Sequence, residues 1–202
     1  MRPFYKFGRQ CLIQFENISY STERGCCLND LTLHIDFNEH VALVGEESCG
    51  KSLLLQILVG LIDDYEGAVF LNGINLKSLT LHEWQLLRGQ IGYVFEEDAL
   101  RSNLNVYDNV ALPYRYHTTI KESLLKPFIS DKLTMLELLN VSQLRPASLS
   151  SNLRKYCSIA RALVMNPPLL VFNEPFLGIT YSYLLKFQEI MTQSINLYPC
   201  TT

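Results

Sequence analysis

The residues best suited to chemistry lie in one loop, whose pattern is G-x-x-x-x-G-K-[ST] and whose residues are Gly45, Glu46, Glu47, Ser48, Cys49, Gly50, Lys51 and Ser52. Two glycines let a backbone turn tightly, so that its amide N–H groups can surround a phosphate. In this pattern Lys51 reaches the β- and γ-phosphate oxygens, and the Ser52 hydroxyl is a ligand for Mg²⁺. We therefore expect residues 45–53, which end at Leu53, to bind a nucleotide.

The other side chains of the loop raise two questions. Glu46 and Glu47 place carboxylates where a polyanion would arrive. They need not prevent binding, because side chains at the x positions can point outward while the amides point inward. Cys49 is either an oxidisable thiol or, more simply, a small side chain that fills the loop. The alternative interpretation of the whole pattern is a glycine turn that merely packs a strand against a helix.

A phosphate loop requires a strand before it and a helix after it. The compact apolar run HVALVG, residues 40–45, predicts a buried strand, and KSLLLQILVGL, residues 51–61, predicts a buried helix. Residues 11–21 and 30–39 are strand-like, with a turn between them. Residues 65–76 predict two strands around an Asn72-Gly73 turn, and residues 80–90 a short helix with a Thr80–Glu83 capping box.

The second half of the chain continues the alternation. Residues 91–96 and 169–174 predict buried strands, and residues 153–166 and 181–195 predict helices. The stretch from Glu97 to about Ser148 reads as helical, with Ser130 or Asp131 as a cap.

This order predicts an α/β fold, with a mainly parallel sheet flanked by helices, an antiparallel β piece and an inserted helical subdomain. We expect three parts: residues 11–96 as the first part of a nucleotide-binding core, 97–150 as the helical subdomain, and 151–202 as the second part of the core.

Composition narrows the class of protein. The 202 residues are 48% hydrophobic and 18% charged, and the formal charge of −3 comes with scattered basic residues, so we expect no nucleic-acid partner. The longest apolar run, Leu53 to Ile62, is too short to span a bilayer, and the amino end shows no signal peptide. We expect a cytoplasmic chain with a membrane role only through partners, and six cysteines that are ordinary buried thiols.

Several motifs together resemble the nucleotide-binding subunit of ABC transporters. After the loop come GAVFLNGINL, IGYVFEEDAL, NVYDNVALP and LSSNLRKYCSIARALVMNPPLLVFNEP, in the order and with the spacing of that family, over about residues 12–195. The phrase NVYDNVALPYRYHT is similar to members that serve bacterial lipid trafficking with Mce-type partners.

The resemblance implies a P-loop NTPase fold, ATP and Mg²⁺ as cofactors, and a homo- or heterodimer that sandwiches two ATP molecules. It also implies integral membrane permease subunits as partners, at the inner face of the cell membrane.

The resemblance also implies roles for residues outside the loop. Glu174 stands at the position of the catalytic glutamate that polarises water, and Lys51 supports the same step. Asn173 replaces the family's aspartate, which supports Mg²⁺, so metal binding should weaken. Glu96 replaces the Q-loop glutamine and can still meet Mg²⁺.

Further positions depart from the family pattern. The signature L-S-G-G-Q reads LSSNL here: Ser150 can still donate to a γ-phosphate across a dimer, but Ser151 and Asn152 replace the glycines. The adenine-stacking aromatic aligns with Thr22, for which Tyr20 can substitute. Three other departures are Ser48 for a loop glycine, Thr180 for the D-loop aspartate, and an end at Thr202 before the switch histidine.

Three functions are consistent with these residues. The first is an ATP-hydrolysing subunit of an ABC transporter. The second is a catalytically impaired ATP-binding regulatory or structural partner of an intact homologue. The third is a truncated or decaying copy without a stable function. We expect an ATP-binding subunit with impaired turnover.

Overall fold

The computed structural model describes residues 13–22, 25–37, 39–175 and 179–197. The chain divides into two compact units, with the boundary between Arg88 and Gly89. The first unit carries the predicted phosphate loop, and the second carries the predicted signature at 149–153 and the strand that precedes Glu174. The division into three parts expected from the sequence stays a prediction.

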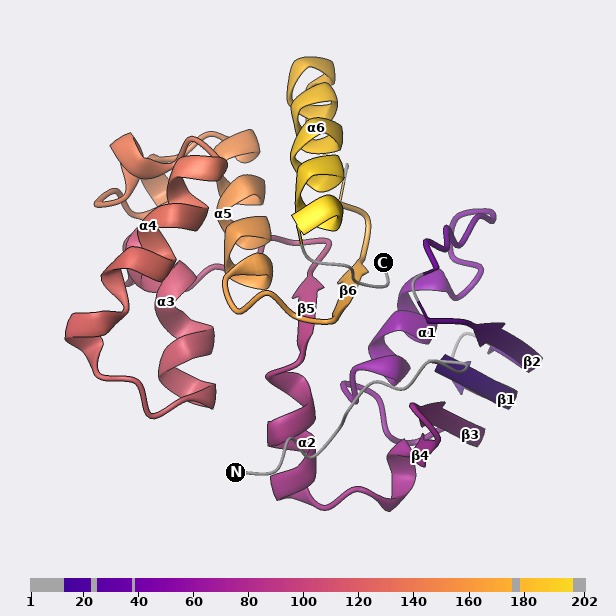
Figure 1. Cartoon of the computed structure of the whole chain (residues 1–202). Helices are drawn as coiled ribbons and strands as arrows, with labels where there is room; N and C mark the ends of the chain where they lie inside the picture. The colour runs from indigo at the N-terminus through magenta and orange to yellow at the C-terminus, as the bar shows by residue number, and fades with distance from the viewer. Residues whose placement is uncertain (1–12, 23–24, 38, 176–178, 198–202) are drawn as a thin grey trace. The chain divides into compact units, whose positions relative to one another are not determined.

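The first unit contains an antiparallel sheet of four strands (Figure 1). Their order is β2-β1-β3-β4, and their bounds are Ile13–Thr22 for β1, Gly25–Ile35 for β2, Glu66–Leu71 for β3 and Ile74–Asn75 for β4. Alternate apolar side chains of β1 and β3 are buried, as period-two patterning requires: Ile13, Phe15, Val69 and Leu71. The Asn72-Gly73 turn joins β3 and β4 with φ of 52° and 77°, which confirms the predicted hairpin.

Two helices complete the first unit. Helix α1 spans Lys51–Leu58, and helix α2 spans Leu81–Arg88 after the short 3₁₀ helix η1, Leu76–Ser78. The capping box is confirmed, because the Thr80 amide donates to Glu83 Oε2 at 2.8 Å and the Glu83 amide donates to Thr80 Oγ1 at 3.3 Å.

The Arg88 guanidinium at the end of α2 stabilises the end of α1. It donates to the carbonyl oxygen of Gly60 at 2.8 Å. A cation is favourable there because a helix presents unpaired carbonyls at its C-terminus.

The predicted strand at residues 40–45 is absent from the structure. Residues 39–46 are all described and belong to no strand, and the Val44 side chain is 92% exposed. An apolar run becomes a strand only when neighbouring strands accept its backbone hydrogen bonds. Among the described residues of the first unit, β1 to β4 pair only with one another, so none of these strands extends its ladder onto residues 40–45.

The second unit contains two parallel strands, β5 (Ile91–Val94) and β6 (Leu169–Phe172). Helix α5, Ser151–Leu163, packs against β5 and against helix α3, Val106–His117. Helix α6, Tyr181–Leu197, ends the described chain. Gly92 of β5 allows the close approach of α5, because a Cβ there would lie 2.5 Å from the carbonyl oxygen of Ala162.

The middle of this unit is helical, as predicted, from α3 onward. The 3₁₀ helix η2 (Glu122–Leu124), helix α4 (Lys126–Met135) and the 3₁₀ helices η3 (Leu139–Val141) and η4 (Pro146–Ser148) follow α3.

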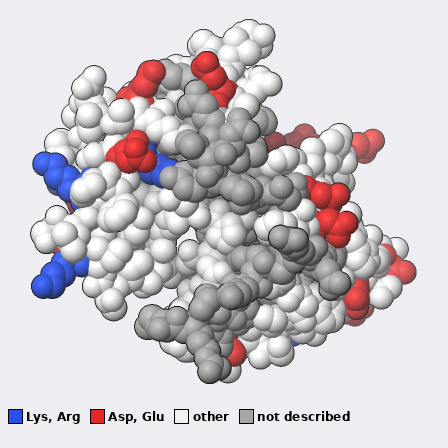
Figure 2. Space-filling view, viewed as in Figure 1, with Lys and Arg blue, Asp and Glu red and all other residues white. Residues whose placement is uncertain are grey.

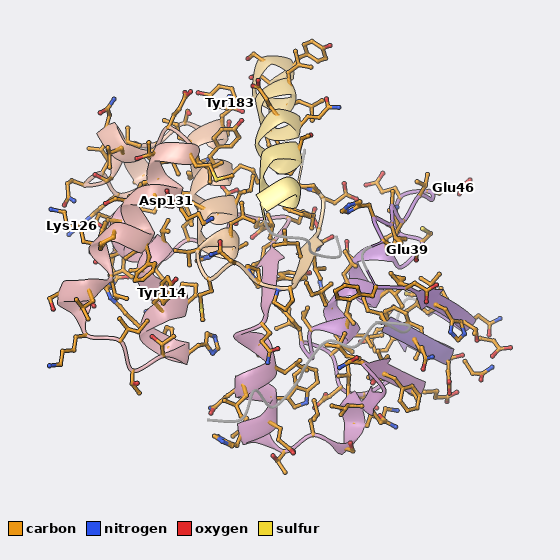
Figure 3. All side chains as sticks on the ribbon, in the orientation of Figure 1. Glu39, Glu46, Tyr114, Lys126, Asp131 and Tyr183 are labelled. Atoms are coloured by element: carbon orange, nitrogen blue, oxygen red, sulfur yellow. The ribbon has the colours of Figure 1, made fainter. Side chains whose placement is uncertain are left out.

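The predicted cap at Ser130 or Asp131 is wrong, because both lie inside α4, where Figure 3 labels Asp131. Pro127 in the first turn starts this helix earlier, since its fixed φ suits a helix start.

Three observations bear on the expectations from composition. No helix among the described residues has the length and hydropathy of a membrane span. On the face drawn in Figure 2, Asp and Glu side chains lie at separate points rather than in one patch. Cys157 is buried, as expected, but Cys49 is exposed and Cys27 half-buried. Cys11, Cys200, the Cys26 side chain and the turn at 23–24 lie outside the described residues.

Candidate nucleotide-binding site

The phosphate loop, defined as residues 45–52, enters α1 through a tight turn. Gly50 is the N-cap of α1 with φ of 94°, and Ser48 also has a positive φ of 63°. The Cys49 amide donates to the carbonyl oxygen of Glu46 at 3.4 Å. A Cβ on Gly50 would lie 2.7 Å from the carbonyl oxygen of Cys27, so the loop needs glycine at this position for both conformation and space.

The Lys51 side chain folds back into its own loop. Its Nζ donates to the carbonyl oxygens of Gly45 at 2.9 Å and Glu46 at 2.7 Å, and lies 3.7 Å from Cys49 Sγ. An ammonium has three N–H groups, and all three of these neighbours belong to the loop. The loop therefore curls around a cation beside the N-terminus of α1.

The groups at the start of α1 are of the kind that binds a polyphosphate. The first N–H groups of a helix have no acceptor within it, and its dipole favours an anion there. The first turn of α1 has no acidic residue. Glu46 and Glu47 are exposed, and Figure 3 shows Glu46 at the outer end of the loop. The inner side of the loop is therefore lined by amide groups and Lys51, and not by these two carboxylates.

The described residues offer few protein ligands for Mg²⁺. Among the described residues, no group of three or more His, Cys, Asp or Glu side chains could hold a metal ion. Ser52 lies in the first turn of α1, next to Lys51. This fits the usual behaviour of Mg²⁺ with nucleotides, which is held by one or two protein ligands together with phosphates.

Asn173 and Glu174 follow strand β6 in the second unit. The Asn173 amide donates to the carbonyl oxygen of Val94 at 2.9 Å and continues the β5–β6 pairing. Asn173 is 5% exposed, whereas Glu174 is exposed and has a positive φ of 48°. Burial raises the pKa of the Tyr93 hydroxyl on β5, and the Asn173 side chain opposes that shift.

Glu96 and Glu174 lie at the same edge of the small parallel sheet. Glu96 follows β5 and Glu174 follows β6. Because the two strands are parallel, both residues lie just beyond the carboxyl ends of the strands. Both residues are exposed. Ligands in open α/β sheets bind outside the carboxyl ends of the strands, which makes this edge a suitable place for them.

The signature segment begins helix α5. Ser150 is the N-cap, and its Oγ accepts from the Leu153 amide at 3.4 Å. Ser151 is exposed. Asn152 hydrogen-bonds Thr180: its Oδ1 accepts from the Thr180 amide at 3.2 Å, and its Nδ2 donates to Thr180 Oγ1 at 3.4 Å. Two positions that depart from the family pattern therefore contact each other.

The candidate adenine contacts lie near the end of β1. Tyr20 is half-buried and Thr22 is exposed, and the β1–β2 register shifts between Tyr20 and Ser21. Both belong to the unit that carries the phosphate loop. Stacking by either residue stays a prediction.

The structure thus groups the predicted site residues in two sets. The first unit holds Tyr20, Thr22 and residues 45–53; the second holds Glu96, Ser150, Ser151, Asn152, Asn173 and Glu174. Sequence reasoning singled out neither Lys155 nor Asp98, which form an ion pair of 3.3 Å beside Glu96. The helical spacing could have identified Lys155. It lies three and four residues before Ser158 and Ile159, which are both buried, and so on the same face of α5.

Comparisons with known proteins identify relatives of the chain. The model of the ABC transporter family matches residues 28–177. The intermembrane phospholipid transport ATP-binding protein MlaF of Escherichia coli is 29% identical over 188 residues, which cover 92% of this chain and 70% of MlaF. The mkl ATP-binding protein of Mycobacterium leprae, named for ribonucleotide transport, is 33% identical over 150 residues, 74% of this chain and 43% of that protein.

Solved structures share the fold. The ATP-binding cassette MJ0796, a dimer bound to ADP and Pi, has a TM-score of 0.86 at 24% identity, covering 94% of this chain and 86% of that chain. A second dimeric structure of this bacterial ABC transporter cassette has a TM-score of 0.85 at 25% identity and the same coverage. Since the family model matches well over half of the residues, the chain belongs to the ABC transporter family, as an ATP-binding subunit.

Proposed function

We propose that this chain binds ATP in the phosphate loop, with Lys51 as the central cation. The observation that carries the proposal is the contact of the Lys51 ammonium with the carbonyl oxygens of Gly45 and Glu46. These acceptors are neutral carbonyls. Hydrogen bonds from an ammonium to a phosphate are charge-assisted and stronger, so an arriving phosphate can displace the carbonyls.

Three residues are proposed for Mg²⁺: Ser52, Glu96 and Asn173. The ion would neutralise charge on the β- and γ-phosphates. Ser52 supplies a hydroxyl oxygen, and the exposed Glu96 supplies a carboxylate. The Asn173 amide is nearly buried and carries no charge, so it contributes less than an aspartate would. Mg²⁺ should therefore bind more weakly than in family members with that aspartate.

Glu174 is proposed to orient the attacking water. Its carboxylate is exposed at the carboxyl end of β6, where it can accept a hydrogen bond from water. Ser150 of a second subunit would donate to the γ-phosphate, but Ser151 and Asn152 replace the glycines that permit close backbone approach. Loss of one preorganised donor typically lowers a rate by ~10²–10³-fold, so slow turnover follows.

The assembly is proposed to be a dimer of ATP-binding subunits, homo- or heteromeric, that acts through membrane permease subunits at the inner face of the membrane. Two dimeric structures of the cassette MJ0796, which has the same fold, support the dimer. The MlaF relatives support a lipid as the transported substrate. The mkl protein is named for ribonucleotide transport, so the proposal of a lipid rests on the MlaF relatives.

A second function is favoured by one observation. The Asn152–Thr180 hydrogen bonds tie up two side chains at positions that usually serve the dimer sandwich. This favours an ATP-binding regulatory partner of an intact homologue, in which this chain hydrolyses little.

Phosphate release separates the two functions. We would measure the rate for the chain and for Glu174→Gln, together with saturable binding of a fluorescent ATP analogue with and without Mg²⁺. A wild-type rate clearly above that of the variant identifies an enzyme. Equal, near-background rates with saturable binding identify the regulatory partner. The absence of a saturable signal at millimolar nucleotide would reject both.

A further inference from the structure

Lys155 is a buried lysine whose donors are all directed at one short segment. It lies on α5 and is 3% exposed. Its Nζ donates to the carbonyl oxygen of Glu96 at 2.7 Å and of Phe95 at 3.2 Å, and lies 3.3 Å from Asp98 Oδ1. A buried charge needs a partner for each donor, and these three acceptors match the three N–H groups of the ammonium.

Two arginines of α5 hold the same segment. Arg161 donates to the carbonyl oxygens of Asp98 at 3.0 Å and Ala99 at 2.7 Å, and Arg154 Nε lies 3.4 Å from Asp98 Oδ2. Ala99 has a positive φ of 49°, a conformation that a residue with a Cβ adopts only when its surroundings hold it. Residues 95–99 are therefore fixed to α5 by cations along that helix.

Glu96 is held by its backbone and not by its side chain. Its carbonyl accepts the shortest of the Lys155 hydrogen bonds, while the residue itself is exposed. The same helix starts at the N-cap Ser150, five residues before Lys155. A rigid helix thus connects the residue proposed to contact the γ-phosphate with the carboxylate proposed to contact Mg²⁺.

We propose that Lys155 is a positioning residue, which fixes the backbone of Glu96 and transmits any displacement of α5 to the Glu96 carboxylate. The role of Glu96 toward Mg²⁺ rests on the proposed function; the attachment of residues 95–99 to α5 does not. A purely structural lysine would affect stability alone. A positioning lysine must also change how strongly nucleotide binding depends on Mg²⁺.

The first experiment needs no nucleotide. Hydrogen–deuterium exchange of residues 95–99 would be compared in the wild-type chain, Lys155→Met and Arg154→Met. The arginine variant is a matched control, because it removes a cation from the same helix and the same Asp98 carboxylate but leaves the Glu96 carbonyl bonded. We expect exchange to rise at least ~10-fold in Lys155→Met and clearly less in the control, because Arg154 contacts only the Asp98 carboxylate of this segment. Unchanged exchange in Lys155→Met would overturn the proposal.

The second experiment measures the gain in affinity for a fluorescent ATP analogue when Mg²⁺ is added. Lys155→Met and Glu96→Gln should each reduce this gain, and the double variant should lose no more than either one, because both act through one carboxylate. Lys155→Arg, which keeps a cation, should recover part of it. If Glu96→Gln loses the gain while Lys155→Met retains it, the positioning role is wrong.

The two experiments distinguish this inference from the proposed function. If the wild-type chain binds no nucleotide, the proposed function fails and with it the link to Mg²⁺. The exchange comparison still decides whether Lys155 fixes Glu96. If Lys155→Met does not fold, Lys155→Ala, which also has no side-chain donor, replaces it in both experiments, with the same outcomes.

Discussion

Asn152 and Thr180 are joined by two hydrogen bonds, of 3.2 Å from the Thr180 amide to Asn152 Oδ1 and of 3.4 Å from Asn152 Nδ2 to Thr180 Oγ1. Each residue stands where the ABC family pattern has another type. Unrelated substitutions in a decaying copy have no reason to bond with each other. The pair therefore favours a folded subunit with altered chemistry.

The bonds between Asn152 and Thr180 should appear as a coupling energy. Thr180→Ala removes the hydroxyl but keeps the amide donor, and Asn152→Ala removes both bonds. For this exposed pair we expect the two substitutions to be non-additive by about 0.5 kcal/mol in the free energy of unfolding. Urea unfolding of both single variants and the double variant measures it. Additive effects would show that the bonds contribute nothing to stability.

Cysteine reactivity should report occupancy of the phosphate loop. Cys49 is exposed, so a maleimide should label it quickly, and ATP should slow the labelling because bound phosphates occupy the loop. Cys157 is fully buried and should resist until the chain unfolds. Mass spectrometry of the labelled peptides gives both rates. A Cys49 rate that saturating ATP leaves unchanged would be evidence against binding at this loop.

Cys157 should also make the fold sensitive to alkali. Burial raises the pKa of its thiol from 9.0 to about 12. The folded chain then keeps a proton that the unfolded chain loses, so the stabilisation is complete below about pH 9 and is lost as the pH rises to about 12. A shift of this size corresponds to at most about 4 kcal/mol.

The measurement is the free energy of unfolding between pH 8 and 12 for the wild-type chain and Cys157→Ala, with Cys49→Ala as the control. The decline with pH should be shallower in Cys157→Ala only. Parallel curves for all three proteins would mean that the Cys157 thiol does not contribute.

Local signals in the sequence predicted local structure well. The Asn72-Gly73 pair and the Thr80–Glu83 box each specify their own geometry within four residues, and both are present. The turn into α1 is local in the same way, because Gly50 caps the helix and Lys51 donates to the Glu46 carbonyl, while phosphate binding by this loop stays a prediction.

Features that depend on distant partners were harder to predict. The apolar run at 40–45 predicted a strand, but a strand also needs neighbours that no run specifies. The cap expected at Ser130 or Asp131 ignored Pro127, which begins α4 earlier. The contact of Lys155 with Glu96 joins residues 59 positions apart. Only the packing of α5 on β5 brings such residues together.

ATP binding at Lys51 can be tested by comparing two lysines of the first unit. Lys51 donates to two loop carbonyls, and Lys77 likewise donates to two, those of Tyr65 at 2.6 Å and Gly67 at 3.0 Å. Lys77→Met is therefore a matched control outside the phosphate loop.

The decisive measurement is a titration of the wild-type chain, Lys51→Met and Lys77→Met with a fluorescent ATP analogue in the presence of Mg²⁺. We predict saturable binding by the wild-type chain, similar binding by Lys77→Met, and affinity at least ~10-fold weaker for Lys51→Met, because a charge-assisted contact with phosphate is lost. Equal affinities for Lys51→Met and the wild-type chain would mean that Lys51 does not hold the ATP phosphates.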